Sequence, residues 1–144
     1  MEMFTLDNQL CFPVYALSRQ LTAMYRPLLE KFDLTYPQYL VMMMLWEKDQ
    51  VTIKEIGEKL LLDTGTLTPL LKRLEQKNYL SRIKGTKDER MVFISLTAQG
   101  KALKSEASKI PGALMCALDI PQAEILSLQQ KLIEFLNKII QNHG

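Results

Sequence analysis

Apolar residues recur at alternating steps of four and three positions along the first part of the chain. The row consists of Leu6, Leu10, Val14, Leu17, Leu21, Met24 and Leu28. This spacing places the side chains on one face of an amphipathic helix. Because proline fits only the first turn of a regular helix, Pro13 indicates that the regular helix begins near Cys11 or bends there. Pro27 indicates a second break or kink.

A second helix, more apolar than the first, is predicted after residue 35. Thr35 is suited to cap its N-terminus, and Pro37 falls in its first turn. Its apolar positions include Tyr39, Leu40, Met43, Met44 and Trp46. Because these positions surround the helix on almost every side, we expect it to be buried.

Shorter elements, separated by turns, follow in the middle of the chain. The tetrad Thr52–Glu55 is a capping box that opens a helix of about two turns. A tight connection then leads to a second short helix, from Thr64 to about Asn78, with Asp63 or Thr64 as its N-cap. Two short helices joined by such a turn predict a helix-turn-helix.

The second of these helices has one apolar and one polar face. The apolar face is formed by Leu67, Leu70, Leu71 and Leu74. The polar face is formed by Thr64, Gly65, Thr66, Thr68, Pro69, Lys72, Arg73 and Gln76. The leucine face is expected to pack on the core and the polar face to meet solvent or a ligand.

Two segments with strand-like alternation come next. They run from Tyr79 to Ile83 and from Met91 to Leu96, and Val92, Ile94 and Leu96 share one face of the second segment. The turn between them is rich in charge and too polar for a core. A hairpin directly after a helix-turn-helix is the arrangement of a winged helix.

The last part of the chain is predicted to be helical. Thr97 is suited to cap a long helix that reaches about Leu118 and bends at Pro111–Gly112. A final helix follows Pro121. Its strict heptad row contains Ile125, Leu128, Leu132, Phe135 and Ile139, and a second apolar row contains Leu126, Ile133, Leu136 and Ile140. One neighbouring helix cannot cover both rows.

Together these elements predict a mainly α-helical fold with a small β-hairpin wing. We expect one compact domain in which residues 36–97 form a winged helix-turn-helix and residues 1–35 and 98–144 form a helical dimerisation region. The terminal helices carry more apolar surface than is needed to cover a small winged helix. We therefore expect a homodimer in which the terminal helices of two subunits pack together.

The composition excludes several classes of protein. The 144 residues are 47% hydrophobic and 24% charged, as in a globular domain and unlike a disordered or fibrous chain. With a single histidine, His143, and two distant cysteines, we expect no metal site, no cofactor and no histidine-dependent catalysis. Because neither a signal-peptide layout nor an apolar stretch of membrane length is present, we expect a cytoplasmic protein without a membrane partner.

Basic side chains gather in the middle of the chain, where residues 52–100 carry 9 basic and 6 acidic side chains. The residues expected to contact double-stranded DNA are Thr64, Gly65, Thr66, Thr68, Pro69, Lys72, Arg73, Arg82, Lys84, Lys87 and Arg90. Hydroxyl groups reach base edges or phosphates, glycine permits close backbone approach, and basic side chains neutralise phosphates. The alternative is that these residues only solvate a surface helix, but the adjoining basic wing favours DNA binding. A dimer would read half-sites about one helical turn apart.

Cys11 is the second candidate for chemistry. A helix N-terminus favours an anionic thiolate, although a cysteine in an apolar helix is more often an inert core residue. Three phenols, those of Tyr15, Tyr25 and Tyr36, lie on or beside the same apolar region, and a phenol that donates a hydrogen bond to sulfur favours the thiolate. Fourteen residues of straight helix separate Cys11 from Tyr25 by about 21 Å. A contact between them requires a sharp fold-back or the partner subunit.

Four segments resemble a known family. They are Gln9–Phe12, Leu34–Tyr39, Leu62–Arg73 and Asp88–Arg90. They are similar to the MarR (multiple antibiotic resistance regulator) family and, within it, to the organic hydroperoxide resistance regulators. The likeness extends from about Leu6 to Gly112.

The resemblance implies roles for individual residues. Cys11 would be the peroxidatic cysteine, hydrogen-bonded in the reduced, DNA-binding state by Tyr25 and Tyr36 of the other subunit. Asp63 would order the DNA-binding helix, and Arg90 would enter the minor groove from the wing. The protein would then be a repressor, not an enzyme.

Cys116 assigns the chain to one of two subclasses in that family. One-cysteine members need a small thiol, whereas in two-cysteine members a resolving cysteine closes an intersubunit disulfide. The resemblance places this sequence with the second kind, so Cys116 of the partner would resolve the oxidised Cys11. The alternative is that Cys116 is a small buried apolar residue.

The expected signal is an organic hydroperoxide, favoured by an apolar lining that includes Phe12, Leu21 and Met24. Other functions stay open at this point. A phenolic ligand could gate a regulator of the same fold, or the regulator could respond to redox signals for virulence, biofilm or antibiotic resistance genes. A thiol peroxidase that turns over many equivalents of peroxide would have no need of a basic winged helix.

Overall fold

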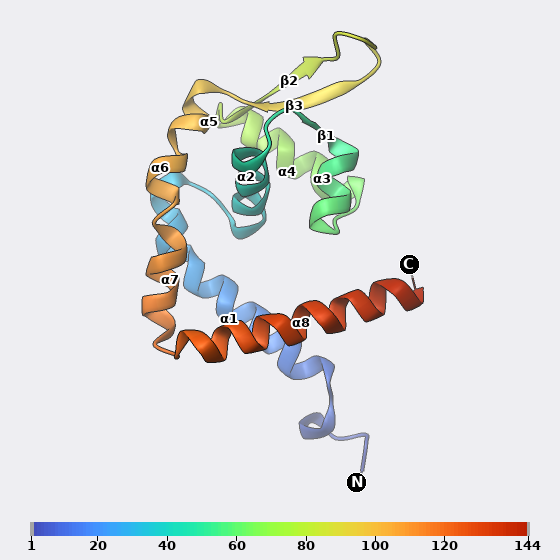
Figure 1. The fold of residues 1–144 in the computed structure, drawn as a ribbon, viewed down its shortest axis with the longest axis vertical. Coiled ribbons are helices and arrows are strands. Elements are labelled where there is room, and N and C mark those ends of the chain that lie inside the picture. Colours follow the sequence, from blue (N-terminus) through green and yellow to red (C-terminus); the bar gives the residue numbers. More distant parts are fainter. Residues whose placement is uncertain (1, 144) are drawn as a thin grey trace. The chain divides into compact units, whose positions relative to one another are not determined.

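The structure, a computed structural model, describes residues 2–143 (Figure 1). In chain order the elements are η1 (Leu6–Asn8), α1 (Cys11–Leu29), η2 (Glu30–Phe32), α2 (Tyr36–Glu47), β1 (Val51–Thr52), α3 (Ile53–Leu60), α4 (Thr64–Gln76), β2 (Leu80–Lys84), β3 (Val92–Leu96), α5 (Ala98–Ala102), α6 (Lys104–Ala107), α7 (Ile110–Leu118) and α8 (Gln122–His143). They form two compact units, which meet in the sequence between Ile110 and Pro111. The predicted mainly helical fold with a small hairpin is confirmed.

Helix α1 begins at Cys11, as Pro13 indicates, but it is not interrupted at Pro27. The predicted break is therefore wrong. Pro27 lies in the last turn, and the N–H of Glu30 still donates to the carbonyl of Arg26. Because the helix ends two residues after the proline, the missing proline N–H removes little of the hydrogen-bond ladder. A 3₁₀ turn, η2, then carries the chain to Asp33, whose φ of 53° is left-handed.

Helix α2 starts with a complete capping box. The Thr35 hydroxyl accepts from the backbone N–H of Gln38, and the Gln38 side chain accepts from the backbone N–H of Thr35. Tyr39, Val41, Met42 and Leu45 of this helix are buried. The helix therefore lies in the core of the first unit. The prediction is confirmed for Tyr39, but Met43, also expected to be buried, is 37% exposed, so the helix is not covered on every side.

The winged helix is built around α2 (Figure 1). Helix α3 opens with the predicted Thr52 and Glu55 capping box, and Asp63 is the N-cap of α4. The four leucines of α4 are buried, as their spacing predicts. Strands β2 and β3 pair antiparallel to form the hairpin, with Arg82 opposite Ile94. Strand β1, which the sequence pattern does not reveal, pairs with the other edge of β3.

The helix predicted from Thr97 to Leu118 is divided into α5, α6 and α7. The interruptions fall at Leu103 and at residues 108–109, not at Pro111–Gly112. The interruption expected at Pro111–Gly112 therefore falls two residues earlier, and Pro111 is the second residue of α7, a position that suits proline. Thr97 does cap α5, since its hydroxyl accepts from the N–H of Gly100.

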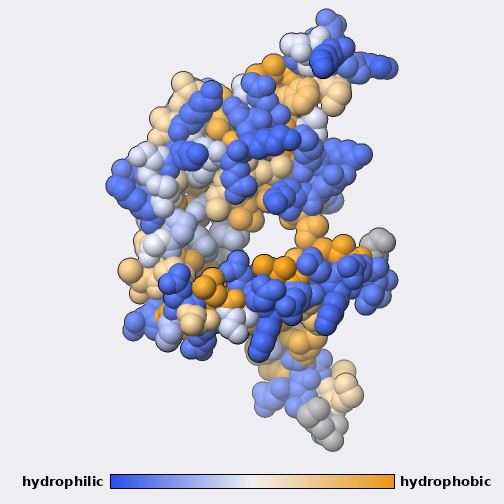
Figure 2. Space-filling model, viewed as in Figure 1, coloured by the Kyte–Doolittle hydropathy of each residue, from blue (hydrophilic) through white to orange (hydrophobic). Residues whose placement is uncertain are grey.

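Helix α8 has apolar side chains along its length (Figure 2). In the single chain Leu132 is 45% exposed and Phe135 is 47% exposed, and neither lies in the buried core. Within residues 2–143, no helix combines the length and the apolar character that crossing a bilayer requires.

Candidate functional site

Three tyrosines meet where α1 crosses the start of α2. The ring centroids of Tyr25 and Tyr36 are 4.7 Å apart, and the ring of Tyr39 lies edge-on to Tyr25 at 5.8 Å. Tyr36 and Tyr39 are separated by 6.3 Å. Tyr39 is buried, whereas the other two are half-buried. The fold therefore brings together two of the tyrosines singled out in the sequence and adds a third.

The environment of this cluster keeps its phenols protonated. Burial, followed by the neighbouring Tyr36 and Tyr39, raises the pKa of Tyr25 to about 12. Burial likewise raises the pKa of Tyr36 and the pKa of Tyr39 above the ordinary value. Near neutral pH each hydroxyl is therefore a neutral hydrogen-bond donor, suited to an anionic acceptor such as a thiolate.

Sequence reasoning missed Tyr39 as a member of the cluster. A signal was present, because Tyr36 and Tyr39 are three positions apart and three positions place two side chains on one side of a helix. We assigned Tyr39 to the core alone, and its burial agrees with that assignment. It does both.

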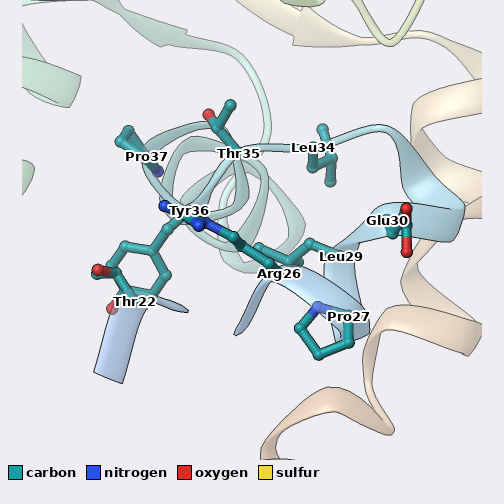
Figure 3. A pocket seen from close by; sticks show the side chains of 9 residues that line it. All are labelled: Thr22, Arg26, Pro27, Leu29, Glu30, Leu34, Thr35, Tyr36 and Pro37. Atoms are coloured by element: carbon teal, nitrogen blue, oxygen red, sulfur yellow. The ribbon is translucent and has the colours of Figure 1, made fainter. Parts of the chain in front are cut away.

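A pocket of about 620 Å³ adjoins the cluster. Thr22 and Arg26 of α1 line it from one side, and Tyr36 and Pro37 of α2 from the other. Figure 3 shows the Arg26 side chain extending alongside Tyr36 toward Pro37, whereas Glu30 points away. No carboxylate within residues 2–143 forms an ion pair with Arg26. The pocket thus offers a cation and a phenol to an incoming group.

Cys11 lies at the opposite end of α1 from the tyrosine cluster. It is the first residue of the helix, its thiol is free and the residue is exposed. Because α1 is continuous from Cys11 to Leu29, Cys11 and Tyr25 of one chain lie about 21 Å apart. The chain does not fold back, so Cys11 does not reach the phenols of its own subunit.

Tyr15 lies outside the cluster as well, and Cys116 belongs to the second unit. Tyr15 is exposed, and the guanidinium of Arg19 sits 5.5 Å from the centroid of its ring. Cys116 is a free, exposed cysteine in α7. The alternative of a buried small apolar residue does not describe Cys116 in the single chain.

The polar face of α4 is exposed along its length, including Thr64, Gly65, Thr66, Thr68, Pro69, Lys72 and Arg73. Its first turn is held by Asp63, whose carboxylate accepts from the N–H of Thr66 at 3.2 Å. Hydrogen bonds from the Thr66 side chain and backbone lower the pKa of Asp63. The Thr68 hydroxyl donates to the carbonyl of Thr64 at 2.9 Å and keeps its oxygen available as an acceptor.

The wing carries basic side chains in two different settings. Lys84 and Lys87 are exposed near its hydrophilic tip (Figure 2). Arg82 is paired with Glu75 of α4 at 2.6 Å. Arg90 is 92% exposed and is held by Asp88, whose pKa is lowered by hydrogen bonds from the Arg90 backbone and then its side chain. Arg82 therefore joins the wing to α4, whereas Arg90 projects into solvent.

Within residues 2–143, no group of three or more His, Cys, Asp or Glu side chains comes together.

Comparison with known proteins identifies the family. Residues 23–107 match the family described as transcriptional regulator SarA/Rot. The organic hydroperoxide resistance transcriptional regulator of Bacillus subtilis is 45% identical over 96% of this chain and 94% of its own length. The regulator SarZ of Staphylococcus aureus is 41% identical over 95% of this chain and 93% of its own.

Solved structures agree with this assignment. Reduced AbfR bound to DNA has a TM-score of 0.77 and 36% identity over 94% of both chains. Disulfide-formed AbfR has a TM-score of 0.66 and 37% identity over 91% of this chain and 92% of that one. AbfR is a protein of Staphylococcus epidermidis. The resemblance drawn from the motifs is confirmed: the chain belongs to the SarA/Rot family of MarR-type winged-helix transcriptional regulators, and is a regulator and not an enzyme.

Proposed function

We propose that this protein is a cytoplasmic, redox-sensing repressor that binds operator DNA as a homodimer while Cys11 is reduced. An organic hydroperoxide would oxidise Cys11 and release the DNA. The relative named for organic hydroperoxide resistance supports the proposed signal. The reduced and disulfide-formed structures of AbfR support the two proposed redox states.

The observation that carries the proposal is the cluster of protonated phenols formed by Tyr25, Tyr36 and Tyr39. It offers O–H donors to an anion, and Cys11 of the same chain is about 21 Å away. In a homodimer the thiolate of Cys11 of the partner subunit would fill this role. Residues 1–35 and 98–144 would form the dimer, and the exposed apolar rows of α8 would pack against a second copy.

The chemistry at sulfur requires only the peroxide and thiols. The Cys11 thiolate attacks one oxygen of the hydroperoxide, the O–O bond breaks, and the leaving alkoxide takes a proton to give an alcohol. Cys11 is then a sulfenic acid. The thiol of Cys116 from the partner subunit displaces the sulfenic hydroxyl as water and forms an intersubunit disulfide. Two cellular thiols would reduce that bond and become oxidised themselves.

DNA binding would use the two exposed basic surfaces of each subunit. Helix α4 would enter the major groove with Thr64, Thr66 and Thr68 near base edges, while Lys72 and Arg73 contact phosphates. Arg90 would reach the minor groove from the wing. Movement at the dimer interface would change the separation of the two α4 helices and so spoil the fit to two half-sites.

Operator affinity before and after oxidation tests the proposal. We would select a duplex from a random-sequence DNA library with the reduced protein and measure its affinity by fluorescence anisotropy, with and without cumene hydroperoxide. Wild type should lose at least tenfold in affinity, whereas Cys11→Ser should bind equally under both conditions. Equal loss in the two proteins would remove Cys11 from the mechanism.

Cys116 is tested by a non-reducing gel. Wild type should give a covalent dimer after cumene hydroperoxide, and Cys116→Ser should not. A persistent dimer band would show that another residue resolves the sulfenic acid.

A second candidate function is favoured by the pocket between α1 and α2. An aromatic carboxylate could pair with Arg26 and accept a hydrogen bond from the Tyr36 hydroxyl, and its binding there could gate DNA affinity without any cysteine. Salicylate should then weaken DNA binding equally in wild type and Cys11→Ser. Absence of any effect at millimolar salicylate would reject this function.

A further inference from the structure

The C-terminal end of α4 is tied to the segment that begins α2. The ammonium of Lys77, the C-cap of α4, donates to the backbone carbonyl of Asp33 and, at 3.1 Å, to the side-chain oxygen of Gln38. It also lies 3.6 Å from the carboxylate of Asp33. Only 24% of the Lys77 side chain is exposed. An ammonium has three N–H donors, and three oxygen atoms surround this one.

A second bond joins the same two segments. The buried Tyr79 hydroxyl, two residues beyond Lys77, donates to the carbonyl of Phe32 at 2.9 Å. The connection between η2 and α2 is therefore attached to the chain leaving α4 at both Phe32 and Asp33.

The oxygen that Lys77 contacts belongs to the N-terminal cap of α2. Gln38 is 2% exposed, and its side-chain oxygen also accepts from the backbone N–H of Thr35 at 3.0 Å. Tyr36 lies between these two cap residues and points its ring at Tyr25. The buried side-chain oxygen of Gln38 therefore accepts hydrogen bonds from two elements. One comes from the first turn of α2, which carries Tyr36, and the other from the C-terminal end of α4, the helix proposed to read DNA.

We infer that Lys77 is a positioning residue that couples the Tyr36 end of α2 to α4. The inference rests on the proposed function, because it assumes that Tyr36 responds to the redox state of Cys11. A change at the first turn of α2 would reach Gln38 through the capping box and α4 through the Lys77 ammonium. Loss of the bond would let α4 keep its DNA-binding position after Cys11 is oxidised.

A lysine at the end of a helix can hydrogen-bond the carbonyl groups of its own last turn. Here the side chain is directed to another element, and its acceptors are a buried amide and the backbone of a left-handed residue. Coupling between two sites is a free energy and has to be measured as one, because proximity alone does not establish it.

The measurement is the ratio of DNA affinities of reduced and oxidised protein. We would compare wild type, Lys77→Met and Tyr79→Phe on the duplex selected with reduced wild type, using cumene hydroperoxide as the oxidant. Lys109→Met is the matched control, because it removes the same charge from a surface ion pair with Glu106. The rate of Cys11 oxidation is followed in parallel by loss of free thiol.

Lys77→Met should oxidise Cys11 at the wild-type rate but lower the affinity ratio at least threefold. Tyr79→Phe should lower the ratio in the same direction, and Lys77→Arg, which retains charge and donors, should restore part of it. Lys109→Met should behave as wild type.

An unchanged ratio in both Lys77→Met and Tyr79→Phe would overturn the inference. So would a changed oxidation rate, because Lys77 would then act on the sulfur chemistry. Failure of the proposed function looks different, since wild type itself would then show no loss of affinity on oxidation.

Discussion

At the scale of single residues, the tyrosine cluster shows how a fold changes an ordinary side chain. Tyr25, Tyr36 and Tyr39 are three phenols of the same chemistry as the exposed Tyr15, yet packing buries Tyr39, half-buries the other two and raises the pKa of each clustered phenol. The cost of ionising one phenol increases beside the others. The result is a donor surface that stays protonated across the range of pH in which a cell lives.

The raised pKa of Tyr25 predicts a loss of stability in alkali. The folded chain holds this proton up to about pH 12, whereas the ordinary pKa is 10.0, so the stabilisation is complete below pH 10 and disappears as the pH rises toward 12. Because the side chain is only partly buried, we expect a contribution on the order of 1 kcal/mol. Urea unfolding at several pH values measures it. Tyr25→Phe should flatten the decline, Tyr15→Phe should not, and identical slopes would contradict the prediction.

At the scale of elements, the ends of the short helices decide where the functional side chains stand. Helix α4 begins where the Asp63 carboxylate accepts from Thr66, and this bond fixes the turn that presents Thr64, Gly65 and Thr66. At its other end the ion pair of Glu75 and Arg82 attaches the helix to the wing. The two proposed DNA-contacting elements are therefore positioned by side chains that need not touch DNA themselves.

Loss of the Asp63 cap is expected to weaken DNA binding without changing its salt dependence. Asp63→Ala would fray the first turn of α4 but leave Lys72 and Arg73 to contact phosphates, so affinity should fall several-fold at every salt concentration with the same slope. Asp63→Asn removes the same charge and keeps a capping acceptor, and it should bind nearly as wild type. Anisotropy titrations across a salt series give both values. Equal losses in the two variants would assign the effect to charge.

Gly100 is the point where α5 approaches the chain leaving α4. A β-carbon there would collide with the backbone carbonyl of Tyr79, and the carbonyl of Gly100 accepts from the Trp46 indole at 3.0 Å. Gly100→Ala should therefore destabilise the fold by about 1–3 kcal/mol. Gly112→Ala is the control, because nothing lies within 4 Å of its β-carbon position and alanine favours a helix. Thermal unfolding of both variants tests the contrast, and equal midpoints would refute it.

At the scale of the whole molecule, the exposed apolar rows of α8 require a covering surface. Large apolar side chains such as Leu128, Leu132 and Phe135 are each more than 40% exposed in the single chain, and they recur along one helix. A contiguous apolar surface of this kind is typical of a subunit interface. In the proposed homodimer, Cys11 would meet the phenols of the partner subunit, which its own subunit cannot offer.

A charge in this row should separate the proposed dimer. Leu132→Glu would bury an unpaired carboxylate at a cost of about 3 kcal/mol and weaken dimerisation on the order of 100-fold. Ser127→Glu, on the polar side of α8, is the matched control. Sedimentation equilibrium gives the dissociation constants. If Leu132→Glu remains as dimeric as the control, α8 is not the interface.

Periodicity located nearly every helix because local hydrogen bonds and caps decide where a helix begins. The capping residues Thr35, Thr52 and Thr97 were all identified from sequence. Strand β1 was not, because two residues carry no periodicity and exist as a strand only through pairing with β3. The interruption at Leu103 was missed because no glycine or proline stands at that position or next to it.

The sequence by itself determined the amphipathic helices, the helix-turn-helix with its charged wing, and the family, since each depends on residues close together in the chain. Only the tertiary structure decided that Tyr39 joins Tyr25 and Tyr36, that Arg82 pairs with Glu75 and that Lys77 reaches Gln38. These contacts join residues on different elements, and their formation depends on how the helices pack. The local sequence pattern contains no information about the distance between two elements. That distance is set when the side chains of both elements pack into the shared core.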